Sequence, residues 1–308
     1  MQPEIDFVSL LARVVPNGRL QRTWSLDGGM SARLTALEVV LPDGQKQTLV
    51  ARQPNPAALR HNPQAATVEY RLLQLLCAAD VPVPQPLWLD ESPCVVTAFA
   101  AGKMDFALKH ANRYAVQMAE QLAAIHRVTG WEGLGLPQAG GCGELAAPFH
   151  LNEALGEGSI RAALAKHGLA RPQNGSVLLH GDFWPGNVLW EAGELTAVLD
   201  WEDARVGDPL LDLAISRLDL AWIFSPETAG VFTERYGELT AVCHTNLPYW
   251  DLCAALRFIR ITGANLAPWA AYYQPFNRPD ITEQTIRGHY QWFVNQALGK
   301  LGEPLIGD

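Results

Sequence analysis

A dense group of side chains that could do chemistry lies between residues 180 and 200 of the 308-residue chain. The run HGDFWPGN carries Asp182 and Asn187, five residues apart, and the run LDWED carries Asp200, eighteen residues after Asp182. The flanking sequence predicts short strands separated by a tight loop, which would bring the three side chains to one loop mouth. There a carboxylate can accept a hydroxyl proton, while two further oxygens can hold Mg²⁺ against phosphates. The pattern therefore predicts phosphoryl transfer to an alcohol.

Each of these residues also has a purely structural interpretation. Aspartate often caps turns between strands, so Asp182 or Asp200 taken singly could do only that. Taken together with Asn187 at these spacings, they favour an active centre over a set of turn caps.

HGDFWPGN followed by VLDWEDARVGDPLLDLA resembles the aminoglycoside phosphotransferase and choline kinase-like family, whose members are relatives of the protein kinases. The resemblance is sharp over residues 178–214 and extends over most of the chain. It implies an α+β, two-lobed protein-kinase-like fold, with a small antiparallel-sheet N-lobe and a larger, mainly helical C-lobe. It also implies that Asp182 is the catalytic base, that Asn187 and Asp200 hold Mg²⁺, and that ATP or GTP is the co-substrate.

Four other polar residues near this signature are assigned structural roles. The resemblance suggests that His180 braces the catalytic loop. Asp208 precedes a proline, a helix-start pattern, and we expect it to begin a helix and to buttress the loop by accepting backbone N–H groups. Asp212, four residues on, is expected to be structural as well. His126 ends an apolar helix face and is interpreted as a core histidine with satisfied hydrogen bonds.

The elements around the site divide the chain near residue 100. Residues 20–26, 33–41 and 47–53 read as an antiparallel meander, and 87–89 and 94–99 as two further strands. Between them Asn62 and Pro63 are typical of a helix start. Residues 1–100 are therefore predicted to be a nucleotide-binding N-lobe and 101–308 a helical C-lobe with the catalytic loop and substrate site. Predicted helices lie near 105–129, 152–167, 208–223, 227–236, 249–264 and 282–300.

The N-lobe carries weaker nucleotide signals. Gly28, Gly29 and Ser31 lie in a turn between strands, where glycines let backbone N–H groups approach phosphates. The same Asp-Gly-Gly sequence is also an ordinary hairpin turn. The resemblance implies that backbone groups of Ala98 and Ala100, at the end of CVVTAFAAG, meet the adenine edge.

A basic residue on the third strand, paired with a helix glutamate, is usual in the family and its kinase relatives. Here the resemblance points to Arg52 in LVARQ and to Glu69 in EYRLLQLL. Arginine can hold a phosphate and a carboxylate with its planar fork, but it is not equivalent to the usual lysine. The alternative is an unpaired surface arginine and a surface glutamate.

The net charge and the cysteine content indicate which partners and which compartment to expect. The net charge of −9 argues against nucleic acid and anionic membrane as partners and suits a neutral or cationic small molecule. The five cysteines form no CxxC pair, and the N-terminus lacks a signal-peptide pattern, so a reducing, cytoplasmic setting is expected. The acceptor and the oligomeric state are left open, although Glu202, Asp203 and Asp219 could bind amines.

The sequence thus predicts a small-molecule kinase. A pseudokinase that binds nucleotide or a partner without turnover is the alternative from another class. A protein kinase proper is disfavoured, because the chain has HGD and DWE in place of HRD and DFG, and no APE.

Overall fold

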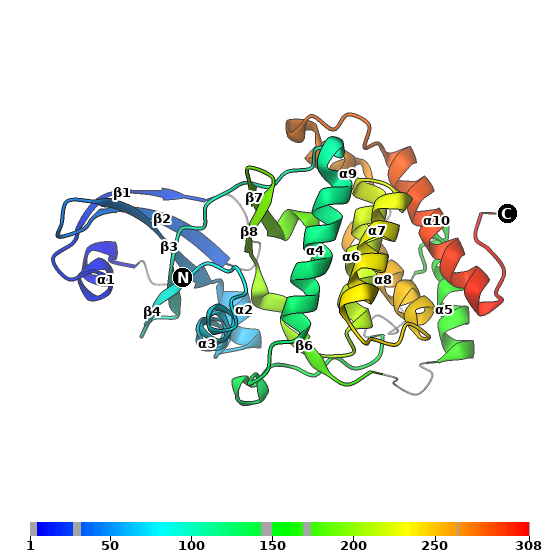
Figure 1. The fold of residues 1–308 in the computed structure, drawn as a ribbon, viewed down its shortest axis with the longest axis horizontal. Coiled ribbons are helices and arrows are strands. Elements are labelled where there is room, and N and C mark those ends of the chain that lie inside the picture. Colours follow the sequence, from blue (N-terminus) through cyan, green and yellow to red (C-terminus); the bar gives the residue numbers. More distant parts are fainter. Residues whose placement is uncertain (1–4, 27–31, 143–149, 169–173, 264, 308) are drawn as a thin grey trace. The chain divides into compact units, whose positions relative to one another are not determined.

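The structure is a computed structural model that describes residues 5–26, 32–142, 150–168, 174–263 and 265–307 (Figure 1). The chain divides into two compact units. The first comprises Met1–Gly102, Gly130–Leu136 and Thr196–Glu202, and the second comprises Lys103–Thr129, Pro137–Leu195 and Asp203–Asp308. Two short segments that the sequence had assigned to the C-lobe thus belong to the unit that contains the N-terminal sheet.

The first unit is built on a five-stranded sheet in the order β1-β2-β3-β5-β4. All neighbouring strands run antiparallel, and the first three form the predicted meander (Figure 1). The register places Leu34 of β2 opposite Arg52 of β3. The strands are β1 (Arg19–Ser25), β2 (Ala32–Val40), β3 (Lys46–Pro54), β4 (Pro86–Asp90) and β5 (Cys94–Ala98).

A helix that the sequence analysis did not anticipate covers part of this sheet. Helix α1 (Phe7–Val14) begins at Asp6, whose side chain accepts the backbone N–H groups of the first turn. Its buried Leu10 and Leu11 belong to one apolar cluster with alternate residues of the strands. Alternation places those residues on the same face of the sheet, so α1 closes a core there. The strand residues of the cluster are Leu37, Val39, Leu49, Ala51, Cys94 and Val96.

Two helices follow β3 where the sequence predicted one. Helix α2 (Pro56–His61) is capped by Asn55, whose side chain accepts the Ala58 N–H at 2.8 Å. The Asn62 N–H closes the end of α2 on the Ala58 carbonyl, so Asn62 is not the N-cap that its sequence context suggested. Helix α3 (Ala65–Ala78) begins three residues later and contacts β3, β4 and β5.

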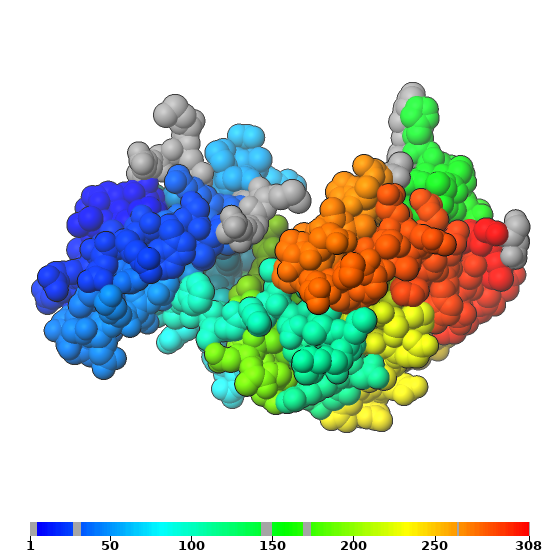
Figure 2. All heavy atoms as spheres, turned by 90° about the horizontal axis from the view of Figure 1, so that it is seen from above, coloured from blue at the N-terminus to red at the C-terminus, as the bar shows by residue number. Residues whose placement is uncertain are grey.

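The second unit is mainly helical and centres on α6. Twelve of the fourteen residues of α6 are buried, because α7, α8 and α10 pack around it. Helix α9 contacts α10, and in Figure 2 the orange segment that contains α9 lies against the orange-red segment of α10. Within the described ranges, no helix has the length and apolar character needed to cross a bilayer. The main helices are α4 (Ala111–His126), α5 (Glu157–His167), α6 (Leu210–Ile223), α7 (Pro226–Leu239), α8 (Leu247–Thr262), α9 (Ala267–Tyr272) and α10 (Glu283–Leu301).

Two small sheets interrupt the helices on either side of the HGDFWPGN run. Strand β6 (Val177–Leu179) pairs with β9 (Arg205–Gly207), a strand that the sequence analysis did not anticipate. Strand β7 (Val188–Glu191) pairs with β8 (Glu194–Val198). Residues 180–187 therefore connect two strands, as predicted.

Candidate active site

The loop after β6 starts with a backbone geometry that only glycine accommodates well. Gly181 has a φ of +83°, and a Cβ at this position would lie 2.2 Å from the carbonyl oxygen of Asp203. Both the positive φ and the close approach exclude larger side chains. The turn at Gly181 thereby fixes the direction in which the chain presents the next residue, Asp182.

Asp212 on α6 anchors the same turn. Its carboxylate is fully buried and accepts the N–H groups of His180 at 2.7 Å and Gly181 at 2.9 Å. Burial acts to raise the pKa of Asp212, but hydrogen bonding and charge from His126, together with the Gly181 N–H, outweigh it and lower the pKa below its ordinary value. Asp212 is therefore an ionised anchor for the loop.

This role had been expected of Asp208, and that expectation is wrong. The Asp208 side chain accepts the N–H of Leu210, the first residue of α6, at 3.0 Å and an Asn174 side-chain N–H at 3.1 Å, so it lies at the start of the helix as predicted. It lies before the helix, whereas Asp212 lies inside it, on the side that meets the loop. The expected structural role of Asp212 is confirmed.

Both histidines near the signature have structural partners. His180 is fully buried, and its Nδ1 accepts the Asp182 N–H at 3.2 Å, which braces the loop internally. His126 contacts the Tyr236 hydroxyl through Nδ1 at 2.7 Å and Asp212 through Nε2 at 3.3 Å. His126 is thus a core histidine with both ring nitrogens satisfied, as predicted.

The structure brings Asp182 and Asn187 together. The Asn187 Nδ2 donates to the Asp182 Oδ2 at 3.1 Å and to its backbone carbonyl at 2.9 Å. Asn187 is nearly buried, at 9% exposure, whereas the Asp182 side chain remains 25% exposed. The base predicted from sequence is therefore held in place but still open to a substrate.

Arg257 on α8 is a site residue that sequence reasoning missed. Its Nη2 lies 2.5 Å from the Asp182 Oδ1, and its side chain is 20% exposed. The two residues are 75 positions apart, and no local motif links them. The available signal was an arginine at a position flanked by apolar residues in CAALRFIRIT, a helical stretch that also holds Arg260.

Asp219 on α6 completes the charged group in the second unit. The Trp222 Nε1 donates to its Oδ1 at 2.9 Å. Burial raises the pKa of Asp219 to about 7, although Arg257 opposes the shift. Burial also acts to lower the pKa of Arg257, but Asp182, Asp219 and Asp203 outweigh it and raise the pKa. The guanidinium therefore stays charged beside Asp182.

In the first unit, Arg52 gathers three carboxylates. It contacts Glu69 on α3 at 2.7 Å, which is the predicted pair, and also reaches Glu202 at 2.8 Å and Asp200 at 3.3 Å. Burial acts to lower the pKa of Arg52, but the three carboxylates outweigh it and raise the pKa. Asp200 has a φ of +61°, a left-handed conformation that is uncommon outside glycine and concentrates at functional positions.

The other residues predicted to bind the nucleotide are Gly28, Gly29, Ser31, Ala98 and Ala100. Gly28, Gly29 and Ser31 lie outside the described residues. The Ala98 N–H donates to the Gln85 carbonyl at 2.9 Å, so this donor is already used within the first unit. The contact of Ala98 and Ala100 backbone groups with adenine stays a prediction, in which Ala98 could offer its carbonyl.

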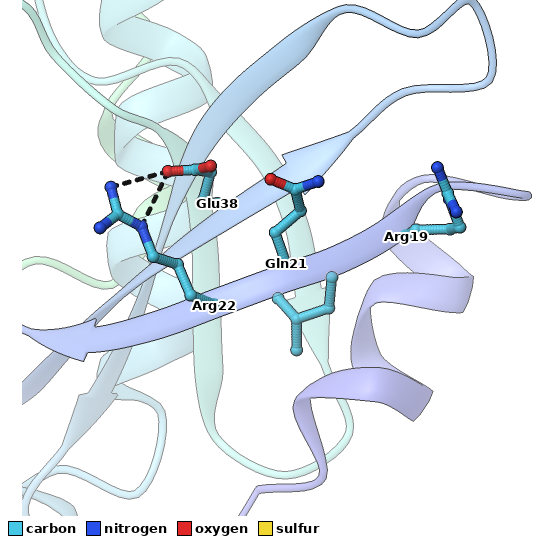
Figure 3. A pocket seen from close by; sticks show the side chains of 5 residues that line it. Arg19, Gln21, Arg22 and Glu38 are labelled. Atoms are coloured by element: carbon cyan, nitrogen blue, oxygen red, sulfur yellow. Dashed lines mark hydrogen bonds and ion pairs between the residues drawn. The ribbon is translucent and has the colours of Figure 1, made fainter.

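A surface hollow on β1 and β2 is separate from these residues. It is lined by Arg19, Leu20, Gln21, Arg22 and Glu38, and Figure 3 shows Arg22 turned toward Glu38, whose carboxylate it contacts at 2.8 Å. None of the predicted site residues lines it, so it is not part of the candidate site.

The donor set suits magnesium better than a transition metal. Across the described ranges, no group of three or more His, Cys, Asp or Glu side chains is placed to hold a metal. Magnesium needs few protein ligands, because it keeps waters and binds phosphate oxygens. The Nδ2 of Asn187 is committed to Asp182, which leaves its amide oxygen as the atom that could meet a cation. An amide oxygen and a carboxylate, as on Asn187 and Asp200, are hard ligands of the required kind.

Comparison with known proteins places these observations in a family. The family model described as "Phosphotransferase enzyme family" (APH) matches residues 26–256, well over half of the chain. Acyl-CoA dehydrogenase family member 11 from Homo sapiens is 28% identical over 268 residues, covering 73% of this chain and 34% of that protein. The protein of the same name from Rattus norvegicus is 27% identical and covers 78% of this chain. The chain spans about a third of the length of these curated relatives.

Solved structures show the same fold. The macrolide 2'-phosphotransferase MphH from Brachybacterium faecium superposes with a TM-score of 0.62 at 23% identity, covering 97% of both chains. The choline kinase LicA from Streptococcus pneumoniae gives a TM-score of 0.59 at 18% identity, covering 96% of this chain and 97% of its own. The kinase-like fold expected from sequence is thereby confirmed.

Proposed function

Because this chain belongs to the phosphotransferase enzyme family, we propose that it transfers the γ-phosphoryl group of ATP to a hydroxyl group of a small molecule. The observation that carries the proposal is the Asp182 carboxylate, which Asn187 and Arg257 hold by one oxygen each while it stays partly exposed. Such a carboxylate is positioned in advance for an incoming alcohol, and positioning supplies most of the catalysis in phosphoryl transfer.

In the proposed reaction, Asp182 orients the acceptor hydroxyl and takes its proton. The hydroxyl oxygen forms a bond to the γ-phosphorus while the bond from that phosphorus to the β–γ bridging oxygen breaks, and ADP leaves. The hydrogen bonds from His180 and Gly181 to Asp212 keep the loop from shifting as charge moves. The protein forms no covalent bond to the phosphoryl group.

The residues of the first unit are assigned to the nucleotide. Arg52 steadies the phosphates, and Glu69 orients its guanidinium through the 2.7 Å contact. Gly28, Gly29 and Ser31 are assigned to the phosphates, and backbone groups of Ala98 and Ala100 to the adenine edge. Structures of this fold support nucleotide use, since LicA has been solved with AMP and an aminoglycoside phosphotransferase APH(4)-Ia mutant with ADP and hygromycin B.

Asn187 and Asp200 would hold the magnesium ion. When bound, the ion neutralises charge on the phosphates as the phosphoryl group moves. Arg52 contacts the Oδ1 of Asp200 at 3.3 Å, so its guanidinium helps to hold this carboxylate in place.

The experiment that tests this proposal measures nucleotide turnover directly. Purified protein is incubated with Mg²⁺ and either ATP or GTP, with aminoglycosides, macrolides, amino alcohols, sugars and hydroxy acids as acceptors, and phosphorylated products are identified by mass spectrometry. We expect product from ATP with at least one acceptor. Asp182→Asn should lower turnover by about 10²- to 10⁴-fold while leaving the melting temperature and ATP binding close to wild type.

Two outcomes would contradict the proposal. Near-normal turnover by Asp182→Asn would remove that residue from the base role. A Mg²⁺-dependent thermal shift with ATP, but no product from any acceptor, would instead favour a nucleotide-binding pseudokinase.

A further inference from the structure

We propose that Arg257 determines the specificity for the acceptor. It binds an anionic oxygen group, a carboxylate or a phosphate, that the acceptor carries near the hydroxyl received by Asp182. This inference rests on the proposed function, which it deepens by naming the chemical class of the acceptor. It differs from the cationic acceptor that the net charge of the chain had suggested.

Arg257 lies beside the position that an acceptor hydroxyl takes when it meets Asp182. Its Nη2 lies 2.5 Å from the Asp182 Oδ1, and the Asp182 side chain is 25% exposed. An alcohol close enough to hydrogen-bond this carboxylate must therefore lie within a few ångströms of the guanidinium. The other carboxylate oxygen faces Asn187, so the two oxygens are held from two sides.

Arg257 also has binding capacity that the protein does not use. A guanidinium carries several N–H donors in a planar fork, and it matches carboxylate and phosphate oxygens in pairs. Within the part of the chain that the structure describes, Asp182 is the only hydrogen-bond partner of Arg257. Its side chain is 20% exposed, so the remaining donors can reach a ligand.

The charges around Arg257 favour an anionic ligand over a cationic one. Asp182 and Arg257 form a pair with no net charge, and Asp219 and Asp203 are the other acids that act on Arg257. Asp203 is itself paired with Arg205 at 3.1 Å, so its charge is balanced by a second guanidinium. Because burial raises the pKa of Asp219 to about 7, this carboxyl is about half protonated near neutral pH. A polyamine would meet the guanidinium and only a weak counter-charge, whereas an anion would gain a charge-assisted hydrogen bond.

A panel of matched acceptors tests the inference. The pairs are glycerate with glycerol, lactate with isopropanol, and pantothenate with panthenol, and choline and ethanolamine serve as cationic members. We expect the wild-type protein to prefer the anionic member of a pair by about 10- to 100-fold in kcat/KM, the range of one charged hydrogen bond. Arg257→Gln should abolish that preference by raising KM for the anionic member, and Arg257→Lys should retain part of it.

Arg260→Gln is the matched control, because Arg260 is an exposed arginine three residues further along α8. It removes the same charge from the same helix and should leave the preference unchanged. A wild-type preference for neutral or cationic members would overturn the inference. So would an equal loss on all acceptors in Arg257→Gln, which would indicate that Arg257 acts only on Asp182.

A binding measurement separates this inference from the proposed function. Thermal shifts are recorded for wild type and Arg257→Gln with ADP and Mg²⁺ in the presence of glycerate, lactate or pantothenate. If turnover fails for every acceptor, the proposed function fails, yet Arg257-dependent stabilisation by an anionic probe would still support the inference. Absence of stabilisation by any anionic probe, together with absence of turnover on it, would overturn the inference.

Discussion

The carboxylate of Asp212 accepts the backbone N–H of Gly181 at 2.9 Å, across 31 positions of sequence. The same carboxylate accepts the adjacent N–H of His180, so a buried charge on the central helix α6 fixes two successive peptide groups of the loop. A buried ionised group with this many partners is costly to disturb, because any partner left alone is desolvated without compensation. The geometry of Asp182 therefore depends on a residue that never meets substrate.

Replacing Asp212 by asparagine should destabilise the protein and slow the reaction. The amide keeps the size of the side chain but turns an N–H₂ group toward one of the two backbone donors, which should lower the free energy of unfolding by about 1–3 kcal/mol. Urea unfolding and steady-state kinetics measure the two effects, and we expect a lower kcat with little change in KM for ATP. Glu238→Gln, on an exposed end of α7, is the control and should shift stability by less than about 0.5 kcal/mol. Equal urea midpoints for Asp212→Asn and wild type would contradict the anchoring role.

Gly181→Ala should be strongly destabilising, whereas Gly288→Ala should not. At Gly181 an added methyl group meets the Asp203 carbonyl and must adopt a positive φ, for which we expect a cost of about 2 kcal/mol or more and a large loss of kcat. Gly288 lies inside α10, and a Cβ there would meet nothing within 4 Å. The helix propensity of alanine should then raise stability by about 0.5–1 kcal/mol. Thermal unfolding of both variants decides this, and similar shifts would refute it.

Arg52→Lys should weaken nucleotide binding while preserving the fold. Lysine keeps one positive charge near Glu69 but cannot reach Glu202 and Asp200 at the same time with a planar fork. We expect KM for ATP and Kd for ADP to rise about tenfold, as measured by kinetics and calorimetry. Arg33→Lys, an exposed position on β2 of the same sheet, provides the comparison and should change neither value. An unchanged Kd in Arg52→Lys would remove this residue from nucleotide binding.

Asp219→Asn should change how stability depends on pH. The folded-state pKa of Asp219 is raised to about 7 from an ordinary value of 3.8, so the folded protein holds this proton more tightly than the unfolded chain. Stability from this group is therefore full at pH values below about 4 and falls through pH 7, at up to about 1 kcal/mol per pH unit. Asparagine removes the penalty, so the variant should gain stability relative to wild type between pH 5 and 8. Urea unfolding at both pH values checks this, and parallel pH profiles would show that Asp219 is not buried in this way.

Local sequence patterns predicted most of the helices and strands and the catalytic-loop motif. Alternating apolar residues predicted the five strands of the first sheet, and the periodicity over 208–223 predicted the buried helix α6. The HGDFWPGN spacing also placed Asp182 and Asn187 in a common loop, where the structure joins them at 3.1 Å. The short helix α1 and the strand β9 escaped prediction, because eight and three residues carry too little periodic signal to stand above coil.

The sequence by itself determined the family and the kinase-like fold, since both depend on motifs or periodicities that can be seen within short stretches of chain. The family resemblance also pointed to the pair Arg52–Glu69, and the structure shows its contact at 2.7 Å. Only the tertiary structure decided that Asp212, not Asp208, anchors the loop of residues 180–187 and that Arg257 donates a hydrogen bond to Asp182. Both facts depend on the packing of α6 and α8, which brings together residues separated by 31 and 75 positions. No spacing rule encodes such contacts, because they arise from how helices fill a common core.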